Sequence, residues 1–399
     1  MTESPRTAPP SADARARIAS LDIVRGLAMV LMAIDHVRVY SGQPAGGPTP
    51  GIFFTRWVTH FVAPAFVFLA GTSAWLYAER RTRGELTRFL VTRGVWLILL
   101  ELTVLRVAWT FNLDYAHYML AGVIWMIGWC MIGLAVLAYL PPRAVLAFGL
   151  VVVLGHNVMD FVPWPQSPGA LASVLYYGGA IPSWDAAPHL DVLFVIVPWI
   201  AVMALGYAFG PVMRFTPERR RAFLIRLGVA CVAAFLVLRG LDVYGDPHHW
   251  RAMRTATQYR PSFPAPLAFL NTNKYPASLL FLLMTLGPMF LALAFTETAR
   301  GLVARVLETF GRVPFFYYVL HIPLIHLSAV VVSLIRTGAV SPWLFGNHPM
   351  EPPPLPPGYQ WSLPLLYLDF VIVLVPLYYA CRWFAGVKRR SANPLLQYL

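Results

Sequence analysis

The sequence predicts an all-α fold: a polytopic membrane helix bundle of about ten transmembrane helices, with both termini cytoplasmic. Of the 399 residues, 58% are hydrophobic and only 12% are charged, whereas a soluble domain is about 45–50% apolar and about 25% charged. Apolar runs of about 20 residues, the length that crosses a bilayer core, recur along the chain. Basic residues cluster in alternate connections between these runs. This positive-inside pattern is typical of a membrane protein, whose partner is the lipid bilayer. It argues against nucleic-acid binding, although the net charge is +13.

Ten apolar runs are long enough to span the membrane, and each must be helical because an unpaired backbone group in lipid costs several kcal/mol. The runs are 20–40, 59–78, 89–109, 118–140, 143–162, 190–212, 222–241, 275–296, 313–335 and 362–385. The first run contains Arg25 and is not followed by a small-residue cleavage site, so we expect an uncleaved helix. The predicted organisation is a disordered cytoplasmic N-terminus (1–18), a transmembrane domain (19–387) and a cytoplasmic tail (388–399).

The arginines set the expected orientation. They precede the first span and occupy every second connection, as Arg80 and Arg81 do between spans two and three, so both termini should be cytoplasmic. The basic connection 242–274 is an exception. Lysine occurs only at 274 and 388, and this preference for arginine favours a bacterial source and hence the inner (plasma) membrane. The long outer connections, rich in proline, glycine and aromatic residues, leave room for a binding site on that side.

Histidines, which exchange protons near neutral pH, lie on one side of the predicted membrane. All ten are near mid-membrane or toward the outside: His36, His60, His117, His156, His189, His248, His249, His321, His326 and His348. Four are candidate catalytic residues: His36 in the first span, His60 at the start of the second, and His321 and His326 in the ninth. The last two can face one cavity only if Pro323 kinks their helix. Bonding to neighbouring helices is the alternative.

The first span carries the densest polar pattern. Five of its residues share one face at intervals of three or four: Asp22, Arg25, Met29, Met32 and His36. Arg25 and His36 are separated by about 16 Å along the helix axis, so one face presents a cation near the inner boundary and an imidazole near the outer one. Asp22 can pair with Arg25, and Asp35 with Arg38. Because ionisable groups inside a membrane are costly and usually functional, Arg25, Asp35 and His36 are candidate catalytic residues. The alternative is that Arg25 and His36 snorkel toward opposite ends of the span.

The sequence does not indicate metal or disulfide chemistry. The three cysteines, Cys130, Cys231 and Cys381, fall inside apolar runs at unrelated spacings. The histidines are numerous, but no ligand spacing among them argues for a zinc site.

Three stretches resemble a known family. Arg25 and His36 stand in SLDIVRGLAMVLMAIDHVR (20–38), which is similar to the first helix of the superfamily of transmembrane acyltransferases. The other two stretches are FFTRWVTHFVAPAFVFLAGTSAWL (53–76) and GRVPFFYYVLHIPLIH (311–326). Together the three resemble bacterial membrane proteins related to the catalytic domain of heparan-alpha-glucosaminide N-acetyltransferase.

The resemblance implies transfer of an acyl group, in this family an acetyl group, across the membrane. A cytoplasmic acyl-CoA acts as co-substrate and an extracytoplasmic glycan or similar acceptor receives the group. Arg25 and His36 match the residues thought necessary for transfer in the superfamily. The lysosomal relative is thought to use a histidine between its first two helices, and no histidine here aligns with it. An acyl-histidine intermediate and direct attack with His36 as base therefore both stay open.

The cytoplasmic arginines are candidates for holding the phosphates of coenzyme A, because arginine binds phosphate bidentately. Those we assign are Arg25, Arg80 and Arg81. Membrane insertion alone explains such arginines equally well.

The main alternative is a proton-coupled secondary transporter of a small molecule. Asp35, Glu101 and Asp369 could form its proton relay together with the histidines. Transporters usually contain inverted repeats and paired broken helices, and the sequence shows neither. An inactive scaffold is a third interpretation, but it has no need of an Arg–His face in its first helix.

Overall fold

The computed structural model describes residues 18–47, 49–163, 165–182, 189–253, 264–350, 352–391 and 393. The predicted disordered N-terminus, apart from residue 18, lies outside the described residues. So does the predicted tail beyond residue 391, apart from residue 393. The first part of that tail is helical, since the last helix runs to Arg390.

Helices occupy all ten predicted spans, which confirms the all-α membrane class. Six helical stretches of the described chain are long and apolar enough to cross a membrane. They are α2 (Pro50–Trp57) with η1 (Val58–Phe61) and α3 (Val62–Ala78), α7 (Pro142–Gly155) with η3 (His156–Phe161), α9 (Val197–Phe209) with η5 (Gly210–Arg214), α10 (Pro217–Leu241), α15 (Pro314–Thr337) and α16 (Leu363–Arg390). The other four predicted spans hold α1 (Ala19–Ser41), α4 (Arg83–Leu100) with η2 (Glu101–Leu105) and α5 (Arg106–Thr110), α6 (Val123–Leu137) and α13 (Leu279–Phe295).

Two predicted spans begin too early, because their first residues form a small sheet. The strands are β1 (Leu120–Ala121), β2 (Gly179–Ile181) and β3 (Leu190–Val192); β3 lies in the middle, parallel to β1 and antiparallel to β2. Span 118–140 therefore becomes helical only at Val123, and span 190–212 only at Val197. Apolar length alone does not locate the first turn. At Val123 it is fixed by the carboxylate of Glu101, which accepts hydrogen bonds from the backbone N–H groups of Ile124 and Trp125 at 2.8 and 3.1 Å.

Glycines set the tightest helix crossings. A Cβ atom on Gly26 would lie 1.8 Å from the carbonyl oxygen of Leu307, and one on Gly311 would lie 1.7 Å from that of Asp22. Such pairs let two backbones touch, which is how helices pack in lipid, where no hydrophobic force joins them. Facing glycines occur at the four helix pairs with the most extensive contact. These pairs are Gly26/Gly311 (α1 with α14, Leu302–Arg312), Gly71/Gly206 (α3 with α9), Gly94/Gly128 (α4 with α6) and Gly228/Gly287 (α10 with α13).

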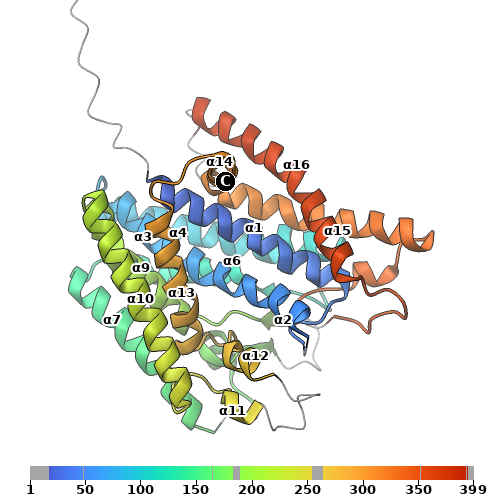
Figure 1. The fold of residues 1–399 in the computed structure, drawn as a ribbon, viewed down its shortest axis with the longest axis horizontal. Coiled ribbons are helices and arrows are strands. Elements are labelled where there is room, and N and C mark those ends of the chain that lie inside the picture. Colours follow the sequence, from blue (N-terminus) through green and yellow to red (C-terminus); the bar gives the residue numbers. More distant parts are fainter. Residues whose placement is uncertain are drawn as a thin grey trace, which may run out of the picture.

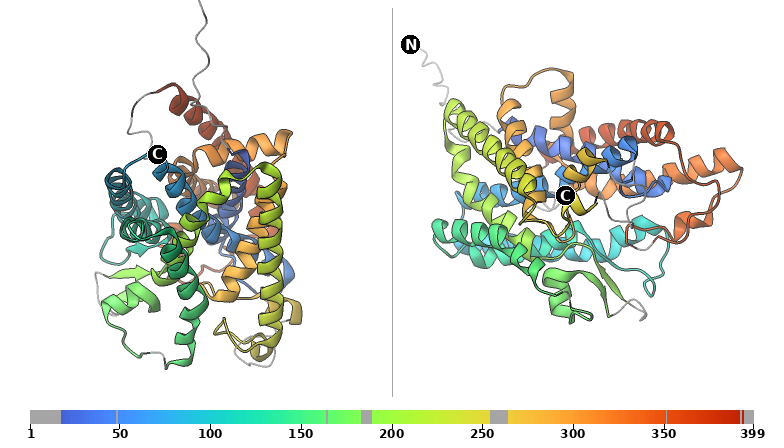
Figure 2. Two further views of the ribbon diagram at one scale, coloured as in Figure 1. Left: turned by 90° about the vertical axis from the view of Figure 1, so that its left-hand side faces the viewer. Right: turned by 60° about the horizontal axis from the view of Figure 1, so that its bottom comes forward.

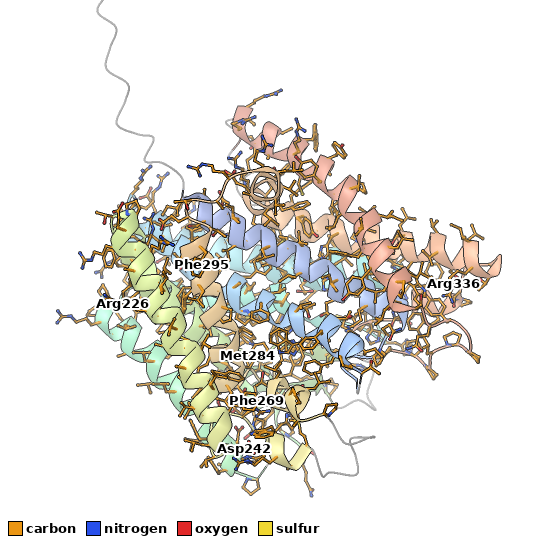
Figure 3. The ribbon with its side chains drawn as sticks, in the orientation of Figure 1. Arg226, Asp242, Phe269, Met284, Phe295 and Arg336 are labelled. Atoms are coloured by element: carbon orange, nitrogen blue, oxygen red, sulfur yellow. The ribbon has the colours of Figure 1, made fainter. Side chains whose placement is uncertain are left out.

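Helix α1 lies at the centre of the bundle, in contact with α3, α13, α14, α15 and α16 (Figure 1). Helices α10 and α13 pack on one flank, where Figure 3 places Arg226 and Asp242 toward opposite ends of α10 and Met284 on α13 beside it. The short strands gather toward one end of the bundle with α8 (Ala170–Ala172), α11 (Trp250–Met253) and α12 (Ala265–Leu270) (Figure 2). Helix α14, the start of α1 and the end of α16 lie at the opposite end (Figure 1). We call these two ends the His36 end and the Arg25 end.

Candidate functional site

A cavity of about 340 Å³ lies around His36 at the end of α1. Asp35 and His36 line it from α1, Arg56 from α2, Glu101 from η2 and Lys274 from the segment before α13. Four segments that are distant in sequence thus direct polar side chains into one space. A concave site with a few convergent polar groups is the usual form of a small-molecule site.

His36 makes a direct contact with His321 of α15. The Nδ1 atom of His36 lies 2.7 Å from the Nε2 atom of His321, and the two rings are stacked with their centroids 4.8 Å apart. The Nδ1 atom of His321 lies 2.6 Å from the carbonyl oxygen of Tyr318. Two predicted catalytic histidines therefore form a pair.

The hydrogen bonds of this pair determine its tautomers. A carbonyl oxygen only accepts, so Nδ1 of His321 carries the proton, and Nε2 of a neutral His321 is then an acceptor. His36 must donate from Nδ1, and its own Nε2 keeps a lone pair. Among the described residues none forms a hydrogen bond with that Nε2 atom. His36 is therefore oriented as a base whose free nitrogen belongs to the cavity-lining ring.

Further aromatic rings pack beside the His36–His321 pair, toward the C-terminus of α1. Trp109 packs edge-on against His36, and Tyr40 stacks against both Trp109 and His326. His36 and Tyr40 are one helical turn apart on α1, so His321 and His326 contact α1 at successive turns. His326 is buried, and its Nδ1 atom lies 3.2 Å from the carbonyl oxygen of Ala108. The structure thus places His326 behind two aromatic rings and outside the lining of the cavity.

Cations outnumber carboxylates around Asp35. Its two oxygens accept hydrogen bonds from Arg38 at 2.9 Å and Arg56 at 2.7 Å. Lys274, which lines the same cavity, is buried against the rings of Phe194 and Tyr275. Burial lowers the pKa of Lys274, although the neighbouring Tyr275 hydroxyl opposes this shift. The carboxylates of Asp35 and Glu101 against the three cations Arg38, Arg56 and Lys274 leave an excess of basic groups that favours an anionic group or a developing oxyanion in the cavity.

A second cavity, of about 350 Å³, holds Arg25. The guanidinium of Arg25 donates to Asp22 at 3.2 Å and to the hydroxyl of Ser73 on α3. Phe66, Val123 and Tyr318 line both this cavity and the one around His36. The two cavities therefore adjoin at these three side chains. The predicted polar face of α1 therefore lines a cavity at each of its ends, with Arg25 in one and His36 in the other.

Three other predicted site residues lie elsewhere. His60 is buried in η1 against Phe281 and does not contribute to the lining of the His36 cavity. Arg80 and Arg81 are exposed at the turn between α3 and α4, where Arg81 pairs with Glu85. Neither arginine is part of the lining of the Arg25 cavity.

The family model described as "Heparan-alpha-glucosaminide N-acetyltransferase, catalytic" matches residues 17–244, more than half of the chain. The chain belongs to this family. The matched segment includes α1 and Arg56 but ends before Lys274 and His321. Comparison with curated proteins gives no match.

Sequence reasoning missed several residues of this candidate site. Lys274, Arg56 and Tyr318 line its cavities but belong to none of the polar patterns recognised in the sequence. A signal was present for Lys274, because it is one of only two lysines and lies in the one outer connection that breaks the positive-inside pattern. The other lysine, Lys388, lines the Arg25 cavity.

Proposed function

We propose that this protein is an integral-membrane acyltransferase that moves an acyl group, in the first instance acetyl, from cytoplasmic acyl-CoA to an extracytoplasmic carbohydrate-type acceptor. The observation that carries the proposal is the free Nε2 atom of His36, oriented by His321 in a cavity that adjoins the one holding Arg25. The family match supports the transferase class. In this proposal the Arg25 end faces the cytoplasm, and the membrane is the plasma membrane, in a bacterium the inner one.

The reaction requires one general base and the replacement of the thioester sulfur by the acceptor oxygen or nitrogen at the acyl carbon. An acceptor hydroxyl or amine attacks the thioester carbonyl, and the Nε2 atom of His36 takes its proton. The carbon–sulfur bond then breaks, and the coenzyme A thiolate leaves and recovers the proton from His36. The products are the acylated acceptor and free coenzyme A. Positive charge from Lys274 and Arg56 stabilises the intermediate oxyanion.

The experiment is a transfer assay in membranes with labelled acetyl-CoA. The family description names a glucosaminide, so a glucosamine-terminated oligosaccharide is the acceptor probe. Replacing His36 with Ala should lower the rate by a factor of about 100 or more, the usual contribution of a general base. His117→Ala is the control, because His117 is exposed and its side chain, within the described part of the chain, pairs with its neighbour Asp114 alone. Undiminished transfer by the His36 variant excludes His36 from the chemistry. Substrate accumulation in sealed vesicles without acyl-CoA indicates a transporter instead.

A further inference from the structure

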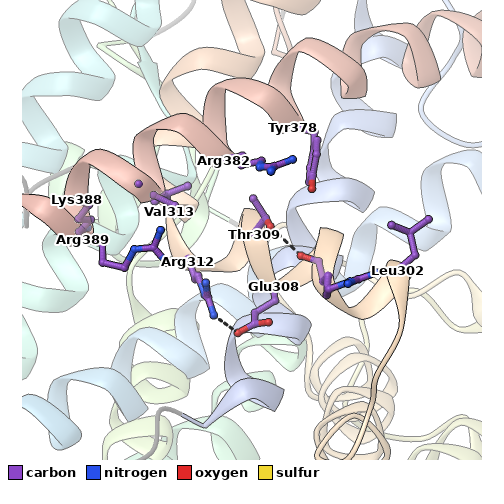
Figure 4. Close-up of a pocket in the computed structure, with 12 residues that line it drawn as sticks. Leu302, Glu308, Thr309, Arg312, Val313, Tyr378, Arg382, Lys388 and Arg389 are labelled. Carbon is purple, nitrogen blue, oxygen red and sulfur yellow. Dashed lines mark hydrogen bonds and ion pairs between the residues drawn. The ribbon is translucent and has the colours of Figure 1, made fainter. Parts of the chain in front are cut away.

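A third pocket opens between α14 and α16 at the Arg25 end of the bundle (Figure 4). Its volume is about 1030 Å³, at the upper end of the roughly 300–1,000 Å³ typical of ligand sites. Both walls are helix faces. Lining residues recur every three or four positions on α14 from Leu302 to Arg312, and likewise on α16 from Tyr378 to Arg389. The pocket lies beyond residue 244, outside the segment matched by the family model.

The pocket is strongly cationic. Its basic lining residues are Arg305, Arg312, Arg382, Lys388 and Arg389. Glu308 is the one carboxylate among the described lining residues, and it pairs with Arg312. No described carboxylate forms an ion pair with Arg305, Arg382 or Arg389. Hydroxyl groups from Thr309 and Tyr378 add hydrogen-bonding capacity, and Tyr378 points from α16 toward α14 (Figure 4). Guanidinium groups gathered without counter-charges match a ligand that carries several phosphate oxygens.

The basic pocket adjoins the cavity that holds Arg25. Lys388 lines both of them, and Val313 of the pocket is followed directly by Pro314 and Phe315 of the cavity. The three cavities are therefore arranged in series. The basic pocket adjoins the Arg25 cavity, and the Arg25 cavity adjoins the His36 cavity at Phe66, Val123 and Tyr318. A ligand anchored by phosphates at the first position could extend a narrow arm toward the last.

We infer that the pocket between α14 and α16 binds the clustered phosphates of the acyl donor, the 3′-phospho-ADP end of acyl-CoA. This inference rests on the proposed function. It assigns the phosphates to α14 and α16 instead of the exposed Arg80 and Arg81. An anionic phospholipid headgroup shares the phosphate chemistry, and the experiment separates the two sources.

The test measures the Kd of coenzyme A and of pantetheine, which lacks the nucleotide, with the whole protein in detergent. Arg382→Gln and Arg305→Gln each remove one cation, and each should raise the Kd of coenzyme A about tenfold, because each removes a charge-assisted hydrogen bond to phosphate. Gly386→Leu fills the pocket without changing its charge; a Cβ atom there meets nothing within 4 Å, so α16 tolerates it. This variant should also weaken coenzyme A. Pantetheine affinity should not change in any of them.

The control is Arg226→Gln, because Arg226 is an exposed arginine on α10, away from this pocket (Figure 3). An unchanged Kd of coenzyme A in all three pocket variants overturns the inference, and so does an equal loss of pantetheine affinity. A parallel measurement compares unfolding temperatures in nanodiscs with and without phosphatidylglycerol. If the variants lose only the lipid-dependent stabilisation, the pocket is a lipid site and the inference is wrong. Transfer that persists despite those results leaves the proposed function intact, whereas a wild-type protein that binds no coenzyme A refutes both.

Discussion

The Nδ1 atom of His36 lies 2.7 Å from the Nε2 atom of His321, although 285 residues separate them in the chain. His321 in turn is fixed by the carbonyl oxygen of Tyr318. This relay orients an imidazole as the third member of a catalytic triad does, but it uses a second histidine and a backbone oxygen. Because α1 and α15 carry the two rings, their packing sets the protonation pattern of the site.

His321 acts through His36, so its replacement should affect the rate more than substrate binding. His321→Leu removes the acceptor for the Nδ1–H group of His36 and should lower kcat about 100-fold with KM nearly unchanged. His321→Gln keeps an acceptor oxygen and should restore part of kcat. Steady-state kinetics and the pH–rate profile of both variants check this. Equal losses in the two variants, with unaltered profiles, would indicate that His321 only fills space.

Val123 lies where the two cavities adjoin, and a larger side chain there should obstruct the acyl group. Val123→Trp should reduce transfer at least about tenfold, because misplacing a reacting group by about 1 Å can cost about 100-fold. Its Kd for coenzyme A should stay within about twofold, since the phosphates bind elsewhere. The matched control is Val136→Trp on the same helix, where Val136 is 71% exposed. Full activity of the Val123 variant contradicts passage at this point.

Gly311 fixes the contact between α14 and α1. A Cβ atom at this position would lie 1.7 Å from the carbonyl oxygen of Asp22, so Gly311→Ala must push the helices apart. We expect a loss of about 2 kcal/mol in the free energy of unfolding, a typical cost of overpacking. Gly386→Ala is the control, because open space surrounds that position and alanine favours helix. Thermal unfolding in detergent measures both, and equal stability of the two variants would refute this account of the α1–α14 contact.

His348, in the segment between α15 and α16, should make stability depend on pH. It is 7% exposed and stacks on Tyr118. Burial, with smaller effects of Arg106 and His189, lowers its pKa from 6.5 to about 4. The unfolded chain therefore binds a proton between pH 6.5 and 4 that the folded chain does not, so stability falls as the pH falls through this range. The full effect is about 3 kcal/mol, at 1.36 kcal/mol per pKa unit.

The measurement for His348 is the unfolding temperature of the wild-type protein and His348→Gln at pH 7 and pH 5. Glutamine does not titrate, so the variant should lose less stability on acidification than the wild type. An identical decrease in both proteins would show that other groups govern the pH dependence.

Local patterns in the sequence were sufficient for the ten spanning segments, apart from the first residues of two of them, and for the polar face of α1. The ion pairs predicted at a spacing of three, Asp22 with Arg25 and Asp35 with Arg38, are both present. The pairing of His36 with His321 could not be predicted, because spacing along one helix gives no information on which helix lies opposite. Lys274 lines the site because the end of the connection 242–274 packs against the bundle. The lengths of the apolar runs give no information on how a connection folds.

Helix α14 was missed for a different reason. It has 11 residues and carries Arg305, Glu308 and Arg312, so it is too short and too polar for a spanning helix and falls in a connection predicted to be cytoplasmic. Its close contact with α1 through Gly26 and Gly311 depends on tertiary packing. The basic pocket between α14 and α16 therefore had no recognisable signal in the sequence.

The central claim is that the acyl group passes through the bundle from the Arg25 end to the His36 end. The most direct measurement uses sealed liposomes containing the protein, with labelled acetyl-CoA outside only and the glucosamine-terminated oligosaccharide either inside or outside. We predict labelled oligosaccharide when the acceptor is sealed inside, and none when donor and acceptor share the outer solution. Product that forms only when both are outside would contradict transfer across the membrane.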